Sequence, residues 1–191
     1  MERPKNGLWL SVLSALLTPI IRALDKPSRP KYEGDLTLPG LHHRVKVYWE
    51  AHGIPHVLAT DEHDLFLAQG YLHAQERLWQ MDMTRRFLTG RIAEVFGDFA
   101  IPWRELASRF RGQTSSDFDF FVRLIGIRES ALSSLELLPA DDLLRLQAYS
   151  DGVNRYIERC GKKLPWEFRV LRYQPKPWRP EDSLTIQKGF A

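Results

Sequence analysis

The chain has 191 residues, of which 43% are hydrophobic and 27% are charged, so it can bury a core and is not a disordered polar chain. Its net charge of +3 comes entirely from residues 1–34, which carry six basic and three acidic residues, because residues 35–191 carry 21 of each. A neutral main part excludes the basic face typical of nucleic-acid-binding proteins, and the single Cys160 excludes an internal disulfide and a cysteine-based zinc cluster.

The first 34 residues are expected to form a leader and a linker. A basic start precedes residues 7–21, a run without charge that would span about 22 Å as a helix, whereas a bilayer core needs about 30 Å. This pattern predicts that residues 1–24 are a signal peptide or a membrane anchor, with residues 7–21 in contact with the membrane. The alternative is a mobile amphipathic helix. Residues 25–34 are polar and rich in proline, and they predict an extended linker.

A β-hairpin is predicted at the start of the main region, residues 35–191. Residues 45–50 alternate apolar and polar side chains and include β-branched residues, which is typical of a strand. Residues 51–53 predict a turn, and residues 54–59 predict a second short strand in which Pro55 marks an edge or a strand start. The two strands should therefore pair with each other.

A long helix is predicted from Asp61 to Gly90, because the residues of one face recur here at steps of three and four positions, which is the period of a helix. The repeating positions are Leu65, Ala68, Leu72, Gln75, Trp79, Met83 and Arg86. Further apolar residues widen this stripe, so we expect the helix to be largely enclosed. Gly70 costs about 1 kcal/mol relative to alanine inside a helix, which favours close packing by another backbone at this position.

Further helices are predicted in the second half of the chain. Residues 91–96 should form a short helical turn, residues 98–117 a looser polar region, and residues 118–138 another helix. Pro139 begins a further helix, which Gly161 ends. We expect its buried side to consist of Leu143, Leu146, Tyr149, Val153, Tyr156 and Ile157.

A connection rich in proline and tryptophan is predicted for residues 162–180. Pro180 then opens a last helix, with Glu181 and Asp182 behind it in the first turn. This helix is still apolar where it stops at Ala191, so we expect the region to be incomplete at its C-terminus. The fold class predicted from these patterns is mainly α with a small β-hairpin.

Five histidines surround the predicted hairpin: His42, His43, His52, His56 and His63. His52 and His56 would lie on one face of an extended strand. A metal site needs three or four converging ligands, and no spacing here matches a known ligand pattern. We therefore expect ordinary turn and surface histidines and predict no metal ligand.

Several other reactive side chains are expected to be structural. His73 and Glu76 share one helical face, which predicts a buried hydrogen bond. Met81 and Met83, which follow Trp79 closely in sequence, should fill the core. No histidine lies near Cys160 in sequence, so a nucleophilic role for this thiol is not expected.

A dense set of charges lies on the predicted long helix and consists of Glu76, Arg77, Asp82, Arg85 and Arg86. Charges on an enclosed helix need partners, so we predict buried ion pairs with an architectural role. The chain contains no G-x-S-x-G, P-loop, G-x-G-x-x-G or H-E-x-x-H motif. The residues by themselves therefore predict no catalytic site.

Four stretches of the chain resemble the N-terminal α chain of the penicillin acylase family. They are Gly53–Val57, then DLFLAQGYLHAQERLWQMDMTRRFLTGRIAEVFG at 64–97, LQAYSDGVNRYI at 146–157, and LPWEFRVLRYQPKPWRPEDSL at 164–184. They follow the family order across residues 45–191. At Arg179 the family often has threonine or a similar cap before the Pro-Glu-Asp helix start, and arginine has no side-chain acceptor for that role.

The resemblance implies the α-chain portion of an αββα N-terminal-nucleophile hydrolase, in which two sheets are covered by helices. In that family the nucleophile is the N-terminal serine of a β chain cut from the same precursor, and its own α-amine is the base. The family often binds one calcium ion, whose α-chain ligand lies beyond residue 191. We therefore expect no catalytic residue, metal ligand or cofactor within this chain, and its substrate-binding residues are unknown.

The function implied by the resemblance is hydrolysis of a linear amide, such as a penicillin or an acyl-homoserine lactone, to a carboxylate and an amine. The β chain and a small-molecule amide are the expected partners, nucleic acid is not one, and the chain alone should be inactive. The family usually works in the periplasm or outside the cell. The alternative is a non-enzymatic, membrane-associated helical scaffold or interaction module. The acyl specificity, the cleavage of the leader and the oligomeric state stay open.

Overall fold

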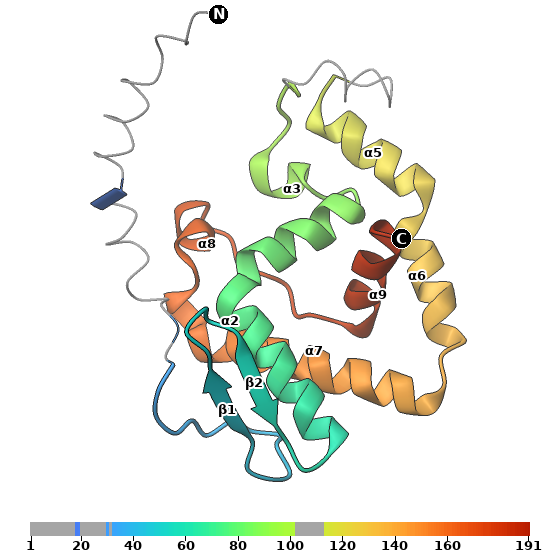
Figure 1. Ribbon diagram of the computed structural model, residues 1–191. Coiled ribbons are helices and arrows are strands. Elements are labelled where there is room, and N and C mark those ends of the chain that lie inside the picture. The colour runs from blue at the N-terminus through green and yellow to red at the C-terminus, as the bar shows by residue number, and fades with distance from the viewer. Residues whose placement is uncertain (1–17, 20–29, 31, 102–112) are drawn as a thin grey trace, which may run out of the picture.

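The computed structural model describes residues 18–19, 30, 32–101 and 113–191 (Figure 1). The predicted leader and linker lie mostly outside these residues. Among the described residues, no helix is both long and apolar enough to cross a membrane. The elements in chain order are β1 (Lys46–Trp49), β2 (Pro55–Leu58), α2 (Glu62–Leu88), α3 (Ala93–Phe96), α5 (Ser115–Ile125), α6 (Ile127–Glu136), α7 (Ala140–Cys160), the 3₁₀ turn η2 (Gly161–Lys163), α8 (Trp166–Val170) and α9 (Pro180–Gly189).

Strands β1 and β2 form the predicted antiparallel hairpin, in which Lys46 pairs with Leu58 and Trp49 with Pro55. Gly53 in the turn has a φ of 75°, a left-handed conformation that glycine adopts without steric cost. Alternate side chains of each strand are half-buried. The hairpin lies beside the first half of α2 (Figure 1), so its inner side chains cover that part of the helix.

Helix α2 crosses α7 at very short range, and two glycines make this possible. A Cβ atom at Gly70 would lie 2.0 Å from the carbonyl oxygen of Tyr149, and one at Gly152 would lie 1.9 Å from that of Leu67. The close backbone packing predicted at Gly70 is therefore confirmed, and Gly152 is its counterpart on α7. The buried hydrophobic cluster beside this crossing contains Tyr71, Ala74, Leu78, Val153, Tyr156, Leu164, Phe168 and Trp178.

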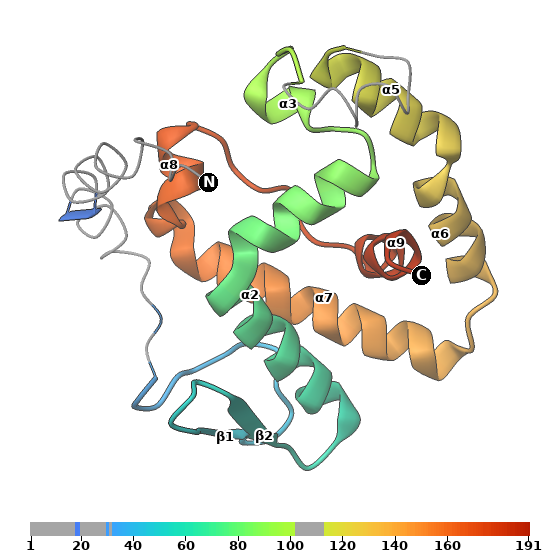
Figure 2. The same ribbon diagram turned by 45° about the horizontal axis from the view of Figure 1, so that its top comes forward.

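Helix α2 bends at Arg77, whose φ of −140° and ψ of 18° are not helical. The bend gives the two halves of α2 different directions (Figure 2). The first half lies against α7 and the hairpin, and the second half leads toward α3 and contacts α9. One long helix thereby contributes to two packing regions.

The single helix predicted for residues 118–138 is wrong, because the structure has two helices there. Gly126 adopts a left-handed conformation with a φ of 76°, ends α5 and begins α6. Helix α5 also starts earlier than predicted. The Thr114 side chain accepts the Asp117 N–H, and Asp117 accepts the Thr114 N–H in return, which forms a capping box. Residues 102–112 of the predicted polar region lie outside the described residues.

Helix α7 begins and ends as predicted, but its buried side differs in part. Leu143 is 39% exposed, whereas Ala148 and Ser150 are buried. The side of α7 that faces α2 is thus lined by small residues as well as by the predicted large ones, because the two backbones approach so closely. The predicted connection after α7 also contains η2 and α8, which sequence periodicity did not predict.

Helix α9 starts at Pro180 as predicted, inside the curve formed by α2, α6 and α7 (Figure 2). The Arg179 side chain cannot accept a hydrogen bond, so the cap depends on Asp182, whose Oδ2 accepts the Arg179 backbone N–H at 2.9 Å. The mainly helical fold with a small hairpin is therefore confirmed. The described residues contain one two-stranded sheet, and the αββα layering of a larger protein stays a prediction.

We predict that Gly152→Ala destabilises the protein, although alanine normally stabilises a helix interior by about 1 kcal/mol relative to glycine. The new methyl group would overlap the Leu67 carbonyl of α2, so the helices must separate. We expect a loss of more than about 2 kcal/mol in the free energy of unfolding, measured by urea titration of the intact protein. Gln147→Ala, on the exposed face of the same helix, is the control and should stay within about 0.5 kcal/mol. Equal stability of the two variants would contradict the close packing.

Candidate functional site

A buried cluster of charges lies on the second half of α2. Asp82 is fully buried, and Arg85 and Arg86 are 7% and 4% exposed. The Oδ1 atom of Asp82 accepts from Arg85 Nε at 2.8 Å, and its Oδ2 accepts from Arg86 Nε at 3.1 Å. The helical spacing of three and four residues places both guanidinium groups beside one carboxylate. The buried ion pairs predicted for these three residues are confirmed.

Arg85 extends the cluster from α2 to the C-terminal part of the chain. Its Nη1 donates to Asp182 Oδ2 at 2.9 Å on α9, and its Nη2 donates to the Lys176 carbonyl at 2.6 Å. Its guanidinium carbon also lies 4.9 Å from the centre of the Trp178 ring. Arg85 therefore holds α9 and the segment before it against α2.

Arg86 extends the cluster in the other direction, toward α3. Its Nη1 donates to Glu94 Oε2 at 3.0 Å, and its Nε donates to the Tyr173 hydroxyl at 3.1 Å. Hydrogen bonds from Arg91, which has the larger effect, and from Arg86 lower the pKa of Glu94 to about 2, although partial burial opposes the shift. Glu94 therefore stays ionised at neutral pH and balances the second arginine.

Asp119 of α5 is a buried residue that the sequence analysis missed. It is 2% exposed, and its two carboxylate oxygens accept the backbone N–H groups of Ile92 and Ala93 at 2.9 and 2.8 Å. These bonds satisfy the free N–H groups at the start of α3. The partners are about 27 residues away along the chain, so no local sequence signal indicates the contact.

Two members of the predicted charge set are not buried. Glu76 and Arg77 are exposed, because the bend of α2 at Arg77 leaves this face open to solvent. The buried hydrogen bond predicted between His73 and Glu76 is also wrong. His73 is exposed and its Nδ1 lies 3.0 Å from the hydroxyl of Tyr149, whereas Glu76 accepts from Tyr32.

Met81 and Cys160 have the structural roles expected of them. Met81 packs against the main cluster, and Trp79 lies edge-on to Phe168 with ring centres 5.0 Å apart. Cys160 is half-buried beside Tyr156, and burial raises the pKa of its thiol. A thiol that stays protonated at neutral pH is a poor nucleophile, which agrees with the prediction for Cys160.

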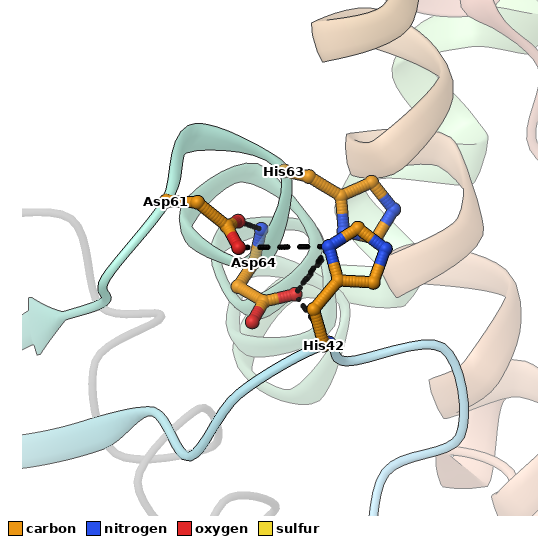
Figure 3. A group of neighbouring side chains, drawn as sticks. All are labelled: His42, Asp61, His63 and Asp64. Atoms are coloured by element: carbon orange, nitrogen blue, oxygen red, sulfur yellow. Dashed lines mark hydrogen bonds and ion pairs between the residues drawn. The ribbon is translucent and has the colours of Figure 1, made fainter.

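A second polar cluster lies at the start of α2 and combines two histidines with two aspartates. His42 comes from the segment before β1, Asp61 is the N-cap of α2, and His63 and Asp64 lie in its first turn (Figure 3). One ligand atom from each of the four side chains lies within 4.8 Å of the others. The His42 and His63 rings are stacked, with centres 4.2 Å apart. The sequence analysis predicted separate surface histidines and did not predict this convergence.

Backbone N–H groups hold both aspartates of this cluster in place. Asp64 is fully buried, and its two oxygens accept the N–H groups of His42 and His43 at 2.9 and 2.7 Å. Burial raises the pKa of Asp64, but these two bonds, together with the side chains of His63 and His42, lower it, and the pKa is lowered overall. Asp61 accepts the Asp64 N–H at 2.8 Å, which lowers its pKa as well. Both carboxylates are therefore ionised at neutral pH.

His52 and His56 lie apart from this cluster. His52 is exposed in the hairpin turn, and His56 Nε2 lies 2.6 Å from Glu50 Oε1. These two residues are the ordinary turn and surface histidines that the sequence predicts.

Large apolar side chains remain exposed on several helices. Among the described residues the most exposed are Leu137 at 84% and Phe190 at 77%, which directly follow α6 and α9, and then Leu124 at 74%, Phe120 at 67% and Leu144 at 65%. A separate open apolar recess lies between α2, α7 and α9 and is lined mainly by Phe66, Met81, Leu146, Tyr149, Trp178 and Ile186. Exposed apolar surface of this kind is typical of a face that packs against another part of a protein.

Comparison with known proteins relates the chain to one family. The family model described as penicillin amidase matches residues 44–191. The chain is 35% identical over 162 residues to penicillin acylase 2 proenzyme of Pseudomonas sp. strain SE83, which covers 85% of this chain and 19% of that protein. It is 32% identical over 150 residues to penicillin G acylase of Escherichia coli, covering 76% and 16%.

Two further matches are an acyl-homoserine lactone acylase and a solved structure. The chain is 31% identical over 161 residues to acyl-homoserine lactone acylase QuiP of Pseudomonas aeruginosa, covering 83% of this chain and 17% of that protein. The structure of the thermostable penicillin G acylase from Alcaligenes faecalis matches with a TM-score of 0.64 and 31% identity, over 77% of this chain and 71% of the solved one. The chain thus spans a fifth or less of the length of these three curated relatives.

We predict that Asp82→Ala destabilises the protein by about 3–5 kcal/mol, because it leaves two buried guanidinium groups without their shared carboxylate. The free energy of unfolding of the intact protein should be measured by urea titration. Asp142→Ala is the matched control, since Asp142 pairs with Arg145 at the surface at the same spacing of three residues. Its loss should stay below about 1 kcal/mol. Similar losses for the two variants would contradict a special role for Asp82.

We also predict that Glu94 contributes stability that depends on pH. Its pKa of about 2 in the folded protein lies below the ordinary value of 4.5, so the contribution is complete above pH 4.5 and is lost as the pH falls toward 2. Because the Glu94 side chain is 50% exposed, we expect less than about 1 kcal/mol. Glu94→Gln should therefore unfold at lower urea than the wild type at pH 7, and the difference should shrink at pH 3. A difference that is equal at both pH values would contradict the ion pairs.

Proposed function

The chain belongs to the penicillin amidase family, and from this premise we propose that it is the N-terminal α-chain segment of an acylase that hydrolyses a linear amide to a carboxylate and an amine. The observation that carries the proposal is the family match over residues 44–191. The agreement in fold with the penicillin G acylase from Alcaligenes faecalis supports it.

The lengths of the related proteins support a precursor that is cut into two chains. The match covers 16–19% of three curated acylases but 71% of the solved chain, which is therefore of similar length to this one. This difference is expected if the acylase precursor is cut into a shorter α chain and a longer β chain. We propose that the β chain of the same precursor is the partner of this chain.

We propose that the reactive hydroxyl comes from the β chain. The usual self-cleavage junction of the family requires a serine that directly follows a glycine, and this sequence contains no such serine. In the proposed mechanism the N-terminal serine of the β chain attacks the amide carbonyl, and its own α-amine accepts the hydroxyl proton. Donors of the β chain stabilise the oxyanion, and the α-amine passes the proton to the nitrogen of the amide, so that the amine leaves. Water then hydrolyses the acyl-enzyme to the carboxylate and restores the serine hydroxyl.

The role of this chain in that mechanism is to support and position the β chain. Arg85, paired with the buried Asp82, also pairs with Asp182 and so fixes α2 to α9, whereas Arg86 pairs with Glu94 of α3. The large exposed apolar side chains, such as Phe120 and Leu124, are available to pack against another chain. Any calcium ion of the family is proposed to be held by residues outside this chain.

The proposed substrate is a small acylated amide. The named relatives include penicillin acylases and an acyl-homoserine lactone acylase, so β-lactam side chains and fatty acyl groups are the two classes to compare. We further propose that the basic and apolar residues 1–24 direct export, so that the enzyme works in the periplasm or outside the cell, with residues 7–21 available for membrane contact.

We predict that the purified 191-residue chain does not hydrolyse acyl-amides, whereas the chain produced together with its β chain does. Release of amine from a chromogenic acyl-amide, a penicillin and an acyl-homoserine lactone would measure both samples. Turnover by the chain alone above the protein-free control would contradict the proposal that the β chain supplies the reactive hydroxyl. A stable two-chain complex that is inactive on the whole panel would instead support a non-enzymatic scaffold.

A further inference from the structure

The cluster at the start of α2 has no part in the proposed amide hydrolysis, and it has the composition of a metal site. Four side chains offer two imidazole nitrogens and two carboxylate oxygens, all within 4.8 Å of one another. They come from two segments of the chain, the loop before β1 and the first turn of α2 (Figure 3). We propose that His42, Asp61, His63 and Asp64 bind one divalent transition-metal cation, for which Zn²⁺ is the best-suited ion.

The distances between the ligand atoms are close to those that such an ion needs. Zinc bonds to nitrogen and oxygen of about 2.0–2.2 Å place the corners of a tetrahedron about 3.3–3.6 Å apart. His42 Nδ1 lies 3.5 Å from Asp61 Oδ2 and 4.0 Å from Asp64 Oδ1, and His63 Nδ1 lies 3.1 Å from Asp64 Oδ1. The imidazoles are 58% and 37% exposed, so small rotations can bring both nitrogens to one ion.

The carboxylates are already oriented for binding. Asp64 is held by the N–H groups of His42 and His43, and Asp61 is held through Oδ1 by the Asp64 N–H. Each carboxylate oxygen has further lone pairs, and Asp61 Oδ2 faces the imidazoles. Backbone donors that fix a ligand in this way are typical of the outer shell of a metal site.

The charges of the cluster favour a divalent cation. The two aspartate carboxylates supply a charge of −2, which one divalent ion balances. The ion pairs that the structure describes for the buried Asp64 all go to histidines, and none goes to lysine or arginine. The positive end of α2 opposes a cation here, but Asp61, Glu62 and Asp64 place three carboxylates at that end.

The donor types favour a transition metal over calcium or magnesium. Imidazole and carboxylate together suit zinc, copper, nickel and iron, whereas calcium and magnesium prefer sites made only of oxygen ligands. His43 Nδ1 also lies 3.1 Å from Asp61 Oδ2 and competes with an ion for that oxygen. A bound ion would replace this histidine contact and would add a second link between the loop at residues 41–44 and the start of α2, beside the N–H bonds of His42 and His43 to Asp64.

The test uses Zn²⁺ itself and the intact protein after treatment with a chelator. The double variant His42→Gln/His63→Gln removes both imidazoles but keeps the backbone N–H groups that hold Asp64. Asp61→Asn removes one charge and keeps an acceptor for the α2 cap. His52→Gln, in the exposed hairpin turn, is the matched control. Zinc binding would be measured by equilibrium dialysis, and the ligands would be counted by X-ray absorption at the zinc edge.

We expect the wild type and His52→Gln to bind one more equivalent of zinc than the double variant, with two imidazoles in the absorption spectrum. Asp61→Asn should weaken binding by about 10-fold or more, since even changes in the outer shell of metal sites cost about 10–100-fold. Equal zinc content in the wild type and the double variant, or a spectrum without two imidazoles, would overturn the proposal. If circular dichroism shows that the double variant is unfolded, Asp61→Asn and the absorption spectrum of the wild type decide. None of these readouts depends on acylase activity.

Discussion

The burial of Asp82 between Arg85 and Arg86 is the interaction on which the C-terminal half of the structure depends. Asp82 is fully buried and the two arginines are almost so, which means that each charge needs a partner, and the pairs extend to α9 through Asp182 and to α3 through Glu94. The segment before α9 is fixed in the same way, because Arg85 donates to its carbonyl groups. Elements up to about 97 residues apart are thereby held at one point of α2.

The first half of α2 is organised by a different constraint, the contact of its backbone with that of α7. Gly70 and Gly152 face the opposite helix at distances where no side chain fits. The bend at Arg77 separates this tightly packed half from the charged half (Figure 2). The same helix can therefore pack against α7 on one side of the bend and gather α3 and α9 on the other.

These constraints place the two ends of α2 in different roles. The charged cluster at its second half is saturated by internal partners, which suits the supporting role proposed for this chain. The cluster of His42, Asp61, His63 and Asp64 at its first turn is partly open to solvent and can accept an ion. Support and proposed metal binding thus use opposite ends of one element and do not compete.

The sequence by itself determined the local features: the hairpin, the extents of α2 and α7, the start of α9, and the pairing of Asp82 with the two arginines. Each follows from a short period or from a spacing of three or four residues, which backbone geometry converts directly into contacts. Only the tertiary structure decided the break at Gly126, the exposure of Glu76, the bonds of Asp119 to α3 and the meeting of His42 with His63. These depend on how loops and bends bring distant segments together, and the path of a loop is set by packing across the whole fold.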